Sequence, residues 1–287
     1  MAENRVTGVG SEVLHSGATP NAIVSGVGAQ VLNSGANSNA RVTGVAVQVL
    51  SAVAVTGSGT QDFNSAGSDA FVVPAYGTLT VERWGGGGAG IGNDIVAGAL
   101  AMIQGADGGT TSDSLGGSVT GGAAGNISTG LGGTGGTASG GNTTNTNGNA
   151  GGDNGSVTQG TLGHGAGAPN GGGDVAAPPD QLGNVAGNQG SAPGGGGSGC
   201  MSHSTGGVPA WYAGGGSGAY SKSVYHAGDP GAPVAGSSIS FTVGAGGPAA
   251  TSAVGMQGGD GSNGRMRVTW TAPLTASTCH TSMHVMT

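Results

Sequence analysis

The stretch VERWGGGGAGIGN, residues 81–93, runs from a strand-like segment through Trp84 into four consecutive glycines. Glycine loses more conformational freedom on folding than any other residue, so four in a row are costly to order. Either contacts made by the folded chain offset that cost, or the stretch has no fixed structure. The rest of the sequence bears on which of these two outcomes holds.

The whole chain is rich in glycine. Its 287 residues include 69 glycines and 11 prolines, more than a quarter of the total. Such a composition is typical of low-complexity or collagen-like chains. Glycine does not recur at every third position, which excludes collagen. Only 7% of the residues are charged, which is unlike a highly charged disordered chain.

Charge and hydropathy exclude several classes of protein. Lysine and arginine number 6 against 13 aspartates and glutamates, for a net charge of −7. There is no basic cluster, so we expect no binding to nucleic acid. The longest apolar run, residues 95–103, is about half the length of a membrane span, and the first residues do not resemble a signal peptide. We therefore expect a soluble protein, without membrane insertion, that is made in a cytoplasm.

An 18-residue repeat occupies the N-terminal region. RVTGVGSEVLHSGATPNA begins at Arg5, IVSGVGAQVLNSGANSNA at Ile23 and RVTGVAVQVL at Arg41. Each unit is a β-branched run followed by Ser, Gly, Asn or Pro, the pattern of a strand and a turn. One unit cannot bury its apolar side alone, so the units must stack on one another or on other chains. We predict an assembly domain over residues 1–56 and, because its large apolar residues are too few, a homotrimer.

The aromatic residues, 3 Phe, 4 Tyr and 3 Trp, are confined to two separated regions. Large rings dominate core energetics, so residues 57–92 and 208–271 are predicted to form the core. Apolar and polar residues alternate in TLTVERW and RMRVTW, which predicts an antiparallel sheet with one face in water. Trp84 and Trp211 are expected on strands of one sheet, which would hold the ends of the intervening segment together.

A glycine-rich insert, residues 93–207, separates the two core regions. It contains no lysine or arginine and has neither the period of a helix nor that of a strand. One interpretation is a coil. In the other, short runs form an extended threefold helix of the polyproline-II type, whose outward backbone groups bond to neighbouring helices where glycine leaves room, as in GGTGGT (132–137). The second is favoured, because a structureless loop of this size is unusual in a compact domain.

These observations give one prediction of the fold. We expect an all-β chain with an antiparallel sheet domain, N-terminal short β repeats, extensive irregular or polyglycine-II-like structure and no significant helix. Such a chain carries its glycines where segments approach too closely for side chains.

Four motifs occur in a recognisable order: FVVPAYGTLTVERWGGGGAGIG (71–92), SGAYSKSVYH (217–226), SFTVGAGG (240–247) and GSNGRMRVTW (261–270). This order resembles the glycine-rich domain near the C-termini of phage tail-fibre and related virion proteins. The N-terminal repeats are similar to short Arg-Val-Thr units of phage structural proteins, which often lie near a virion-attached end. The resemblance implies a virion fibre or adhesin, commonly trimeric, with variable glycine-rich loops. Residues 271–287 have no counterpart in it.

The expected function follows from this resemblance. We expect a phage virion protein, most directly a tail fibre or adhesin. Its N-terminal repeats would bind other virion proteins, and its glycine-rich loops would contact saccharide or protein of the host surface. One alternative is a capsid decoration or head-fibre protein without receptor specificity. Another is an ice-binding or matrix protein built on glycine-helix bundles.

Catalytic motifs are weak in this sequence. GAGIGN (88–93) lacks the strand–helix context of a dinucleotide-binding loop, and no pair of carboxylates has a spacing typical of a hydrolase. We therefore expect neither an enzyme nor a cofactor. Candidate ligand-binding residues are Tyr212, Asn142, Asn145 and Asp153, whereas Trp211 is expected in the core.

Cysteines and histidines offer weak candidates for a metal site. Cys279, His280 and His284 have suitable side chains, but residues 272–287 are typical of a polar, mobile tail. Cys200 is an ordinary loop residue, a ligand together with His203, or a disulfide partner of Cys279. Free thiols are the expectation in a reducing cell.

Overall fold

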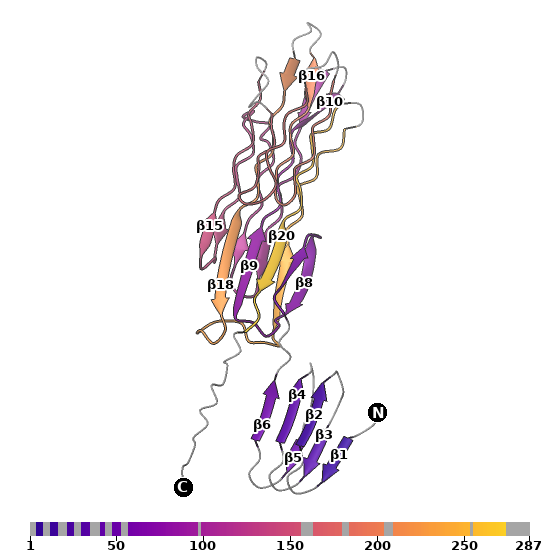
Figure 1. The fold of residues 1–287 in the computed structure, drawn as a ribbon. Coiled ribbons are helices and arrows are strands. Elements are labelled where there is room, and N and C mark those ends of the chain that lie inside the picture. Colours follow the sequence, from indigo (N-terminus) through magenta and orange to yellow (C-terminus); the bar gives the residue numbers. More distant parts are fainter. Residues whose placement is uncertain are drawn as a thin grey trace. The chain divides into compact units, whose positions relative to one another are not determined.

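The computed structural model contains strands and no helix in the part of the chain that it describes (Figure 1). There are two compact units. Residues 1–58, 74–77 and 271–287 form the N-terminal unit, and residues 59–73 and 78–270 form what we call the glycine-rich unit. The described residues are six N-terminal strands between residues 4 and 52, and residues 57–273 except 97–98, 156–162, 180–183, 204–208 and 253–254.

The N-terminal strands form two parallel three-stranded sheets, and each repeat contributes one strand to each sheet. Equivalent positions of successive repeats pair with each other: Val13 pairs with Val31, and Val31 with Val49. The repeat thus fixes the register, because a shift would break the match of like with like. One sheet contains β1 (Asn4–Thr7), β3 (Ala22–Ser25) and β5 (Arg41–Thr43), and the other β2 (Glu12–Ser16), β4 (Gln30–Ser34) and β6 (Gln48–Ala52).

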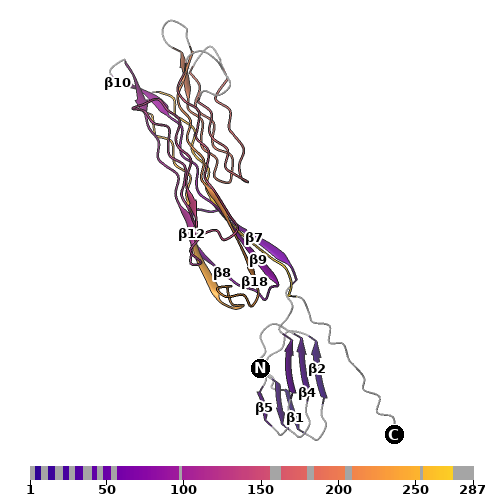
Figure 2. The ribbon, with the colours of Figure 1, turned by 90° about the vertical axis from the view of Figure 1, so that its left-hand side faces the viewer.

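The glycine-rich unit contains two five-stranded antiparallel sheets at one end (Figures 1 and 2). The predictions of an all-β fold and of antiparallel pairing are confirmed. The first sheet has the order β15 (Thr144–Thr146), β18 (Tyr220–His226), β9 (Thr78–Trp84), β20 (Arg265–Trp270) and β7 (Gly59–Phe63). The second has the order β14 (Ala138–Ser139), β13 (Ser118–Val119), β12 (Thr111–Asp113), β19 (Ser238–Val243) and β8 (Gly67–Val72).

Apolar side chains of the two sheets meet in a shared core. Rings from opposite sheets are in contact: the centre of the Phe63 ring lies 4.5 Å from that of Phe241, and the centre of the Phe71 ring 5.7 Å from that of Trp270. Such tilted pairs are a favourable arrangement for aromatic rings. The alternation seen in the sequence places the remaining core residues on the inner faces, and they are Leu79, Val81, Val119, Ile239, Val243, Met266 and Val268.

The predicted insert is not separate from the sheets. Its short strands β12, β13 and β14 extend the second sheet, and β15 extends the first. The absence of a strand period in the insert therefore did not exclude short strands. Strands of two or three residues are too short to show an alternation of polar and apolar residues, so periodicity could not reveal them.

Trp84 and Trp211 do not share a sheet, contrary to expectation. Trp84 ends β9, whereas Trp211 ends β17 (Pro209–Trp211), which forms a two-stranded sheet with β16 (Met201–His203). Residues 212–219 carry the chain from β17 to β18. Both rings are buried, which is all that the aromatic pattern could indicate. The pattern holds no information about the extended segment between Trp211 and the sheet.

An exposed ion pair links two strands of the first sheet and gives a pH-dependent prediction. Arg267 donates two hydrogen bonds to Asp62, from Nε at 2.6 Å and from Nη2 at 2.9 Å. The hydrogen bond from Arg267 holds the pKa of Asp62 below its ordinary value of 3.8. Both side chains are about a third exposed, at 35% and 34%, so water screens the pair.

We expect Asp62→Asn to lower the free energy of unfolding by less than about 1 kcal/mol at pH 7. Because the folded-state pKa is lowered, the pair stabilises the protein above the unfolded pKa and stops doing so as pH falls through the folded pKa. The difference between the variant and the natural protein should therefore shrink below pH 3.8. Urea unfolding at several pH values measures it, and a constant difference would contradict the assignment.

Candidate binding surface

Extended glycine-rich segments run from the two sheets to the opposite end of the unit, which we call the distal end (Figures 1 and 2). Residues 85–91, which follow β9, are all buried. Their N–H groups donate to three neighbouring segments in turn, and the same neighbour returns after three residues. The donor–acceptor pairs are Gly86–Gly109 and Ala89–Ala106, Gly87–Ser262 and Gly90–Gly259, and Gly88–Gly216 and Ile91–Ala213.

Two further segments show the same recurrence. In residues 212–219, N–H groups three residues apart again share one neighbour, and so do those in residues 194–200. The pairs are Gly214–Gly152 and Ser217–Asn149, Gly215–Gly197 and Gly218–Gly194, Gly216–Ala123 and Ala219–Thr120, Gly196–Ala166 and Gly199–Gly163, Gly197–Gly88 and Cys200–Ile91, and Gly195–Ser191 and Ser198–Asn188.

The four glycines after Trp84 are explained by this packing. A Cβ atom on any of residues 85–88 would overlap a carbonyl group of a neighbouring segment, far inside the 3.0 Å that real Cβ contacts respect. Ala89, the next residue, carries a Cβ, and the space that it fills lies beside Gly105, where a second Cβ would be too close. Backbone hydrogen bonds thus occupy the interior where side chains would stand in an ordinary core.

Hairpins and turns close the segments at the distal end. β10 (Gly92–Val96) pairs with β11 (Ala99–Ile103), and β16 pairs with β17. Isolated bridges tie these hairpins to other segments, joining Gly155 to Trp211 and Val185 to Met201. Trp211 is buried here, as expected, and its Nε1 donates to the carbonyl of Pro178 at 3.1 Å.

Two of the predicted ligand-binding residues lie at the distal end. Tyr212 follows Trp211 directly, is partly exposed, and its hydroxyl lies 3.1 Å from Ser202 Oγ. Asp153 Oδ1 accepts the N–H of Gly132 at 2.8 Å, and its carbonyl accepts the N–H of Gly163. Asp153 thus connects neighbouring segments, and one of its carboxylate oxygens is already used in the fold.

The other two, Asn142 and Asn145, lie beside the first sheet instead. The side-chain amide of Asn142 donates to the carbonyl of Val224 at 2.9 Å and accepts its N–H at 2.8 Å. Asn145 makes the same pair of bonds to Gly141, at 2.9 and 3.0 Å. Both amides shape the turn between β14 and β15, so the structure does not bring them together with Tyr212 and Asp153.

Two exposed apolar side chains near the distal end were not selected from the sequence. Met102 is 41% exposed and Leu131 is 53% exposed. Asn154 lies between them: its Nδ2 is 3.7 Å from Met102 Sδ, and its N–H donates at 2.7 Å to the carbonyl of Gly130. The apolar run 95–103 was the available signal, but the sequence alone does not show which of its side chains face solvent.

Of the cysteine and histidine candidates for a metal site, the structure describes the side chain of Cys200. Cys200 is a buried free thiol, and burial raises its pKa to about 12. It therefore stays protonated at neutral pH, which disfavours a role as a thiolate ligand. Cys279, His280 and His284 lie outside the described residues, as does the side chain of His203. No group of three metal-binding side chains occurs among the described residues.

Comparison of the chain with protein-family models, with curated proteins and with solved structures gives no match. In the part of the chain that the structure describes, no helix could span a membrane. Arguments about function therefore depend on the geometry of this chain.

Proposed function

We propose that the glycine-rich segments are polyglycine-II-like helices packed side by side into one rigid body. The recurrence of hydrogen-bond partners after three residues supports this assignment, because a threefold helix without internal hydrogen bonds directs its backbone groups to successive neighbours. The exclusion of Cβ atoms from most inward positions supports it as well. A body of this kind resists bending, since its segments are bonded to several neighbours along their length.

We propose that this body is the stalk of an adhesin, a fibre protein of a phage particle, that presents its distal end to the host surface. The observation that supports the proposal most is a difference between the body and its distal end. The interior of the body has little room for side chains, whereas Met102 and Leu131 near its distal end are exposed. Loops held by a rigid scaffold are where recognition usually resides. No catalytic role is proposed.

The proposed partners follow from the two units. The stacked N-terminal repeats would join the chain to other virion proteins and to two further copies in a homotrimer. The distal end would bind a saccharide or a protein of the host surface. Amide, hydroxyl and backbone groups there suit hydrogen bonding to sugars, and Met102 and Leu131 suit an apolar contact.

A surface variant tests the role of the distal end. We expect Met102→Asp combined with Leu131→Asp to weaken binding of the purified chain to host cells by about tenfold or more, since carboxylates in an apolar contact lose their hydration. Fluorescently labelled protein and flow cytometry measure the binding.

The matched control is Val234→Asp, because Val234 is 72% exposed and lies between β18 and β19, at the opposite end of the unit. It should bind cells like the unchanged chain. Equal losses in both variants, or no loss in either, would count against the adhesin and favour a decoration protein. Inhibition of ice growth without cell binding would favour the ice-binding alternative.

A further inference from the structure

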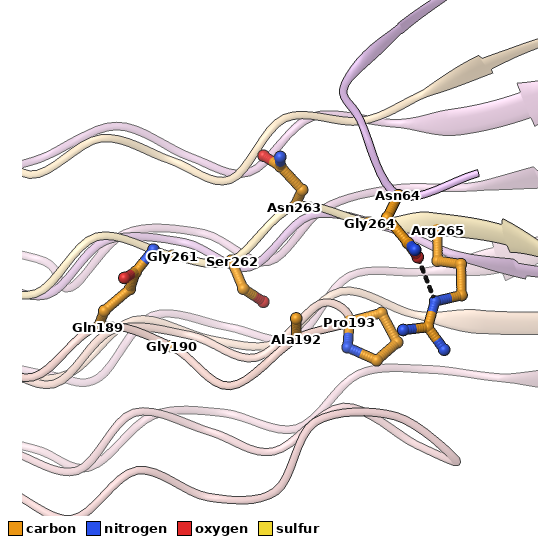
Figure 3. Close-up of a pocket in the computed structure, with 10 residues that line it drawn as sticks. All are labelled: Asn64, Gln189, Gly190, Ala192, Pro193, Gly261, Ser262, Asn263, Gly264 and Arg265. Carbon is orange, nitrogen blue, oxygen red and sulfur yellow. Dashed lines mark hydrogen bonds between the residues drawn. The ribbon is translucent and has the colours of Figure 1, made fainter. Parts of the chain in front are cut away.

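A polar pocket of about 480 Å³ lies where the glycine-rich body meets the first sheet, away from the distal end (Figure 3). Two glycine-rich segments form its walls, one around Gln189 to Pro193 and one from Gly261 to Gly264. Arg265, the first residue of β20, and Asn64, in the turn after β7, close one side. This volume is within the range of small-molecule sites, and it leaves room for one sugar ring.

The walls of the pocket are fixed by hydrogen bonds between the two segments. Ser262 Oγ donates to the carbonyl of Ser191 at 2.9 Å, and the N–H of Gly190 donates to the carbonyl of Asp260 at 2.8 Å. The N–H of Gly194 donates to the carbonyl of Asn263 at 2.9 Å. The pocket is therefore preformed, and a ligand would not have to order it.

Arg265 is held in place but keeps hydrogen-bonding capacity. Its Nε donates to Asn64 Oδ1 at 2.6 Å (Figure 3), and its Cζ lies 5.8 Å from the centre of the Trp84 ring. Neither Nη atom has a hydrogen-bond partner among the described residues. The other arginines of the glycine-rich unit differ, because Arg83 is paired with Asp113 and Arg267 with Asp62.

The remaining groups of the pocket favour a sugar over a simple anion. Gln189 and Asn263 line it. Asn263 Oδ1 accepts the N–H of Gly246 at 2.9 Å, so the amide of Gln189 and the Nδ2 of Asn263 are the side-chain amide groups left for sugar hydroxyls. A phosphate site would offer several free backbone N–H groups or more than one cation. Here the pocket has a single cation, Arg265. The N–H groups of Gly190, Gly261, Ser262 and Gly264 donate to carbonyls of the body, whereas those of Gln189, Ala192 and Asn263 have no acceptor among the described residues, so inorganic phosphate is a necessary probe in the test below.

We propose that this pocket binds a carboxylate-bearing monosaccharide, a hexuronic acid in its simplest form. The two Nη atoms of Arg265 donate parallel hydrogen bonds to the carboxylate, the geometry for which a guanidinium is suited. The amides of the walls bind the ring hydroxyls. The site is separate from the distal end, so it gives the protein a second, acidic-sugar specificity that does not depend on the function proposed for that end.

Saturation-transfer NMR with the full-length chain tests the proposal, with sodium glucuronate and glucose as probes. We expect glucuronate to bind at least about tenfold more tightly than glucose, because glucose lacks the charged partner for Arg265. Arg265→Gln should weaken glucuronate binding by a similar factor. Arg267→Gln, made together with Asp62→Asn, is the matched control. It makes the same change two residues further along β20, outside the pocket, and it removes the carboxylate that acts on both Arg267 and Arg265, so it should alter the dissociation constant less than about twofold.

A second variant keeps the arginine in place. Asn64→Asp puts a carboxylate against Arg265 and should also abolish the preference for glucuronate, while thermal unfolding confirms that the chain is folded. The Met102 and Leu131 variant should bind glucuronate normally, which separates this site from the distal end. Equal binding of glucose, equal loss in Arg267→Gln with Asp62→Asn, unchanged binding in Arg265→Gln, or inorganic phosphate binding as tightly as glucuronate would each overturn the proposal.

Discussion

Gly215→Ala should destabilise the protein by more than about 4 kcal/mol or prevent it from folding, although it adds a single methyl group. Gly215 is buried, donates its N–H to the carbonyl of Gly197 at 2.8 Å and accepts the N–H of Ala166 at 3.1 Å. A Cβ there would overlap the carbonyl group of Gly88. A backbone carbonyl cannot rotate away as a side chain can, so the segments would have to separate and lose hydrogen bonds along their length.

Gly173→Ala is the matched control for this prediction. Gly173 also belongs to the glycine-rich unit, but it is exposed and a Cβ there would meet nothing within 4 Å. Its backbone is not in the left-handed region, so alanine should change stability by less than about 1 kcal/mol, and a small gain is expected from the reduced freedom of the unfolded chain. Urea unfolding of both variants gives the comparison. Similar values for the two would contradict the close packing of the body.

Strands with clear alternation were predictable from the sequence. In TLTVERW and RMRVTW the residues assigned to one face, such as Leu79, Val81, Met266 and Val268, are fully buried. The N-terminal repeat also indicated that its units stack, because one unit cannot bury its apolar side alone. Both features are local patterns of side chains, and alternation reports burial directly.

The arrangement of the glycine-rich segments was harder to predict from the sequence. Composition could indicate that glycine was needed for close approach, but the partners of each segment are set by contacts between residues far apart in the chain. Gly88, for example, bonds to Gly216 and Gly197. The pocket beside Arg265 was missed for the same reason, since Asn64, Gln189 and Arg265 come from three distant parts of the sequence.

For Arg83, the sequence predicted burial but not the ion-pair partner. Alternation places it on the same strand face as Leu79 and Val81, and it is indeed fully buried with them. Its partner could not be foreseen, because Asp113 lies in the predicted insert. Arg83 Nε donates to Asp113 Oδ2 at 2.5 Å, and Nη1 lies 3.0 Å from Ser223 Oγ. Nη2 has no hydrogen-bond partner among the described residues, so much of the stabilisation of this charge comes from one carboxylate.

Asp113→Asn should therefore cost about 3–5 kcal/mol in the free energy of unfolding, because it leaves a buried guanidinium without its counter-ion. Asparagine keeps the side-chain oxygen that accepts the N–H groups of Leu115 and Gly117, at 3.0 and 3.2 Å. The turn after β12 is thus preserved, and the change isolates the charge.

The double variant Arg83→Met with Asp113→Asn removes the charge that the single variant leaves unpaired. Methionine fills a similar volume with apolar atoms, and replacing a buried ion pair by neutral groups is often close to neutral for stability. We expect the double variant to recover most of the loss, so the second substitution should be stabilising in the presence of the first. Urea unfolding at pH 7 measures all three proteins. If the double variant were as unstable as Asp113→Asn alone, the loss would come from the turn after β12, where Asp113 accepts the N–H groups of Leu115 and Gly117, rather than from an unpaired charge.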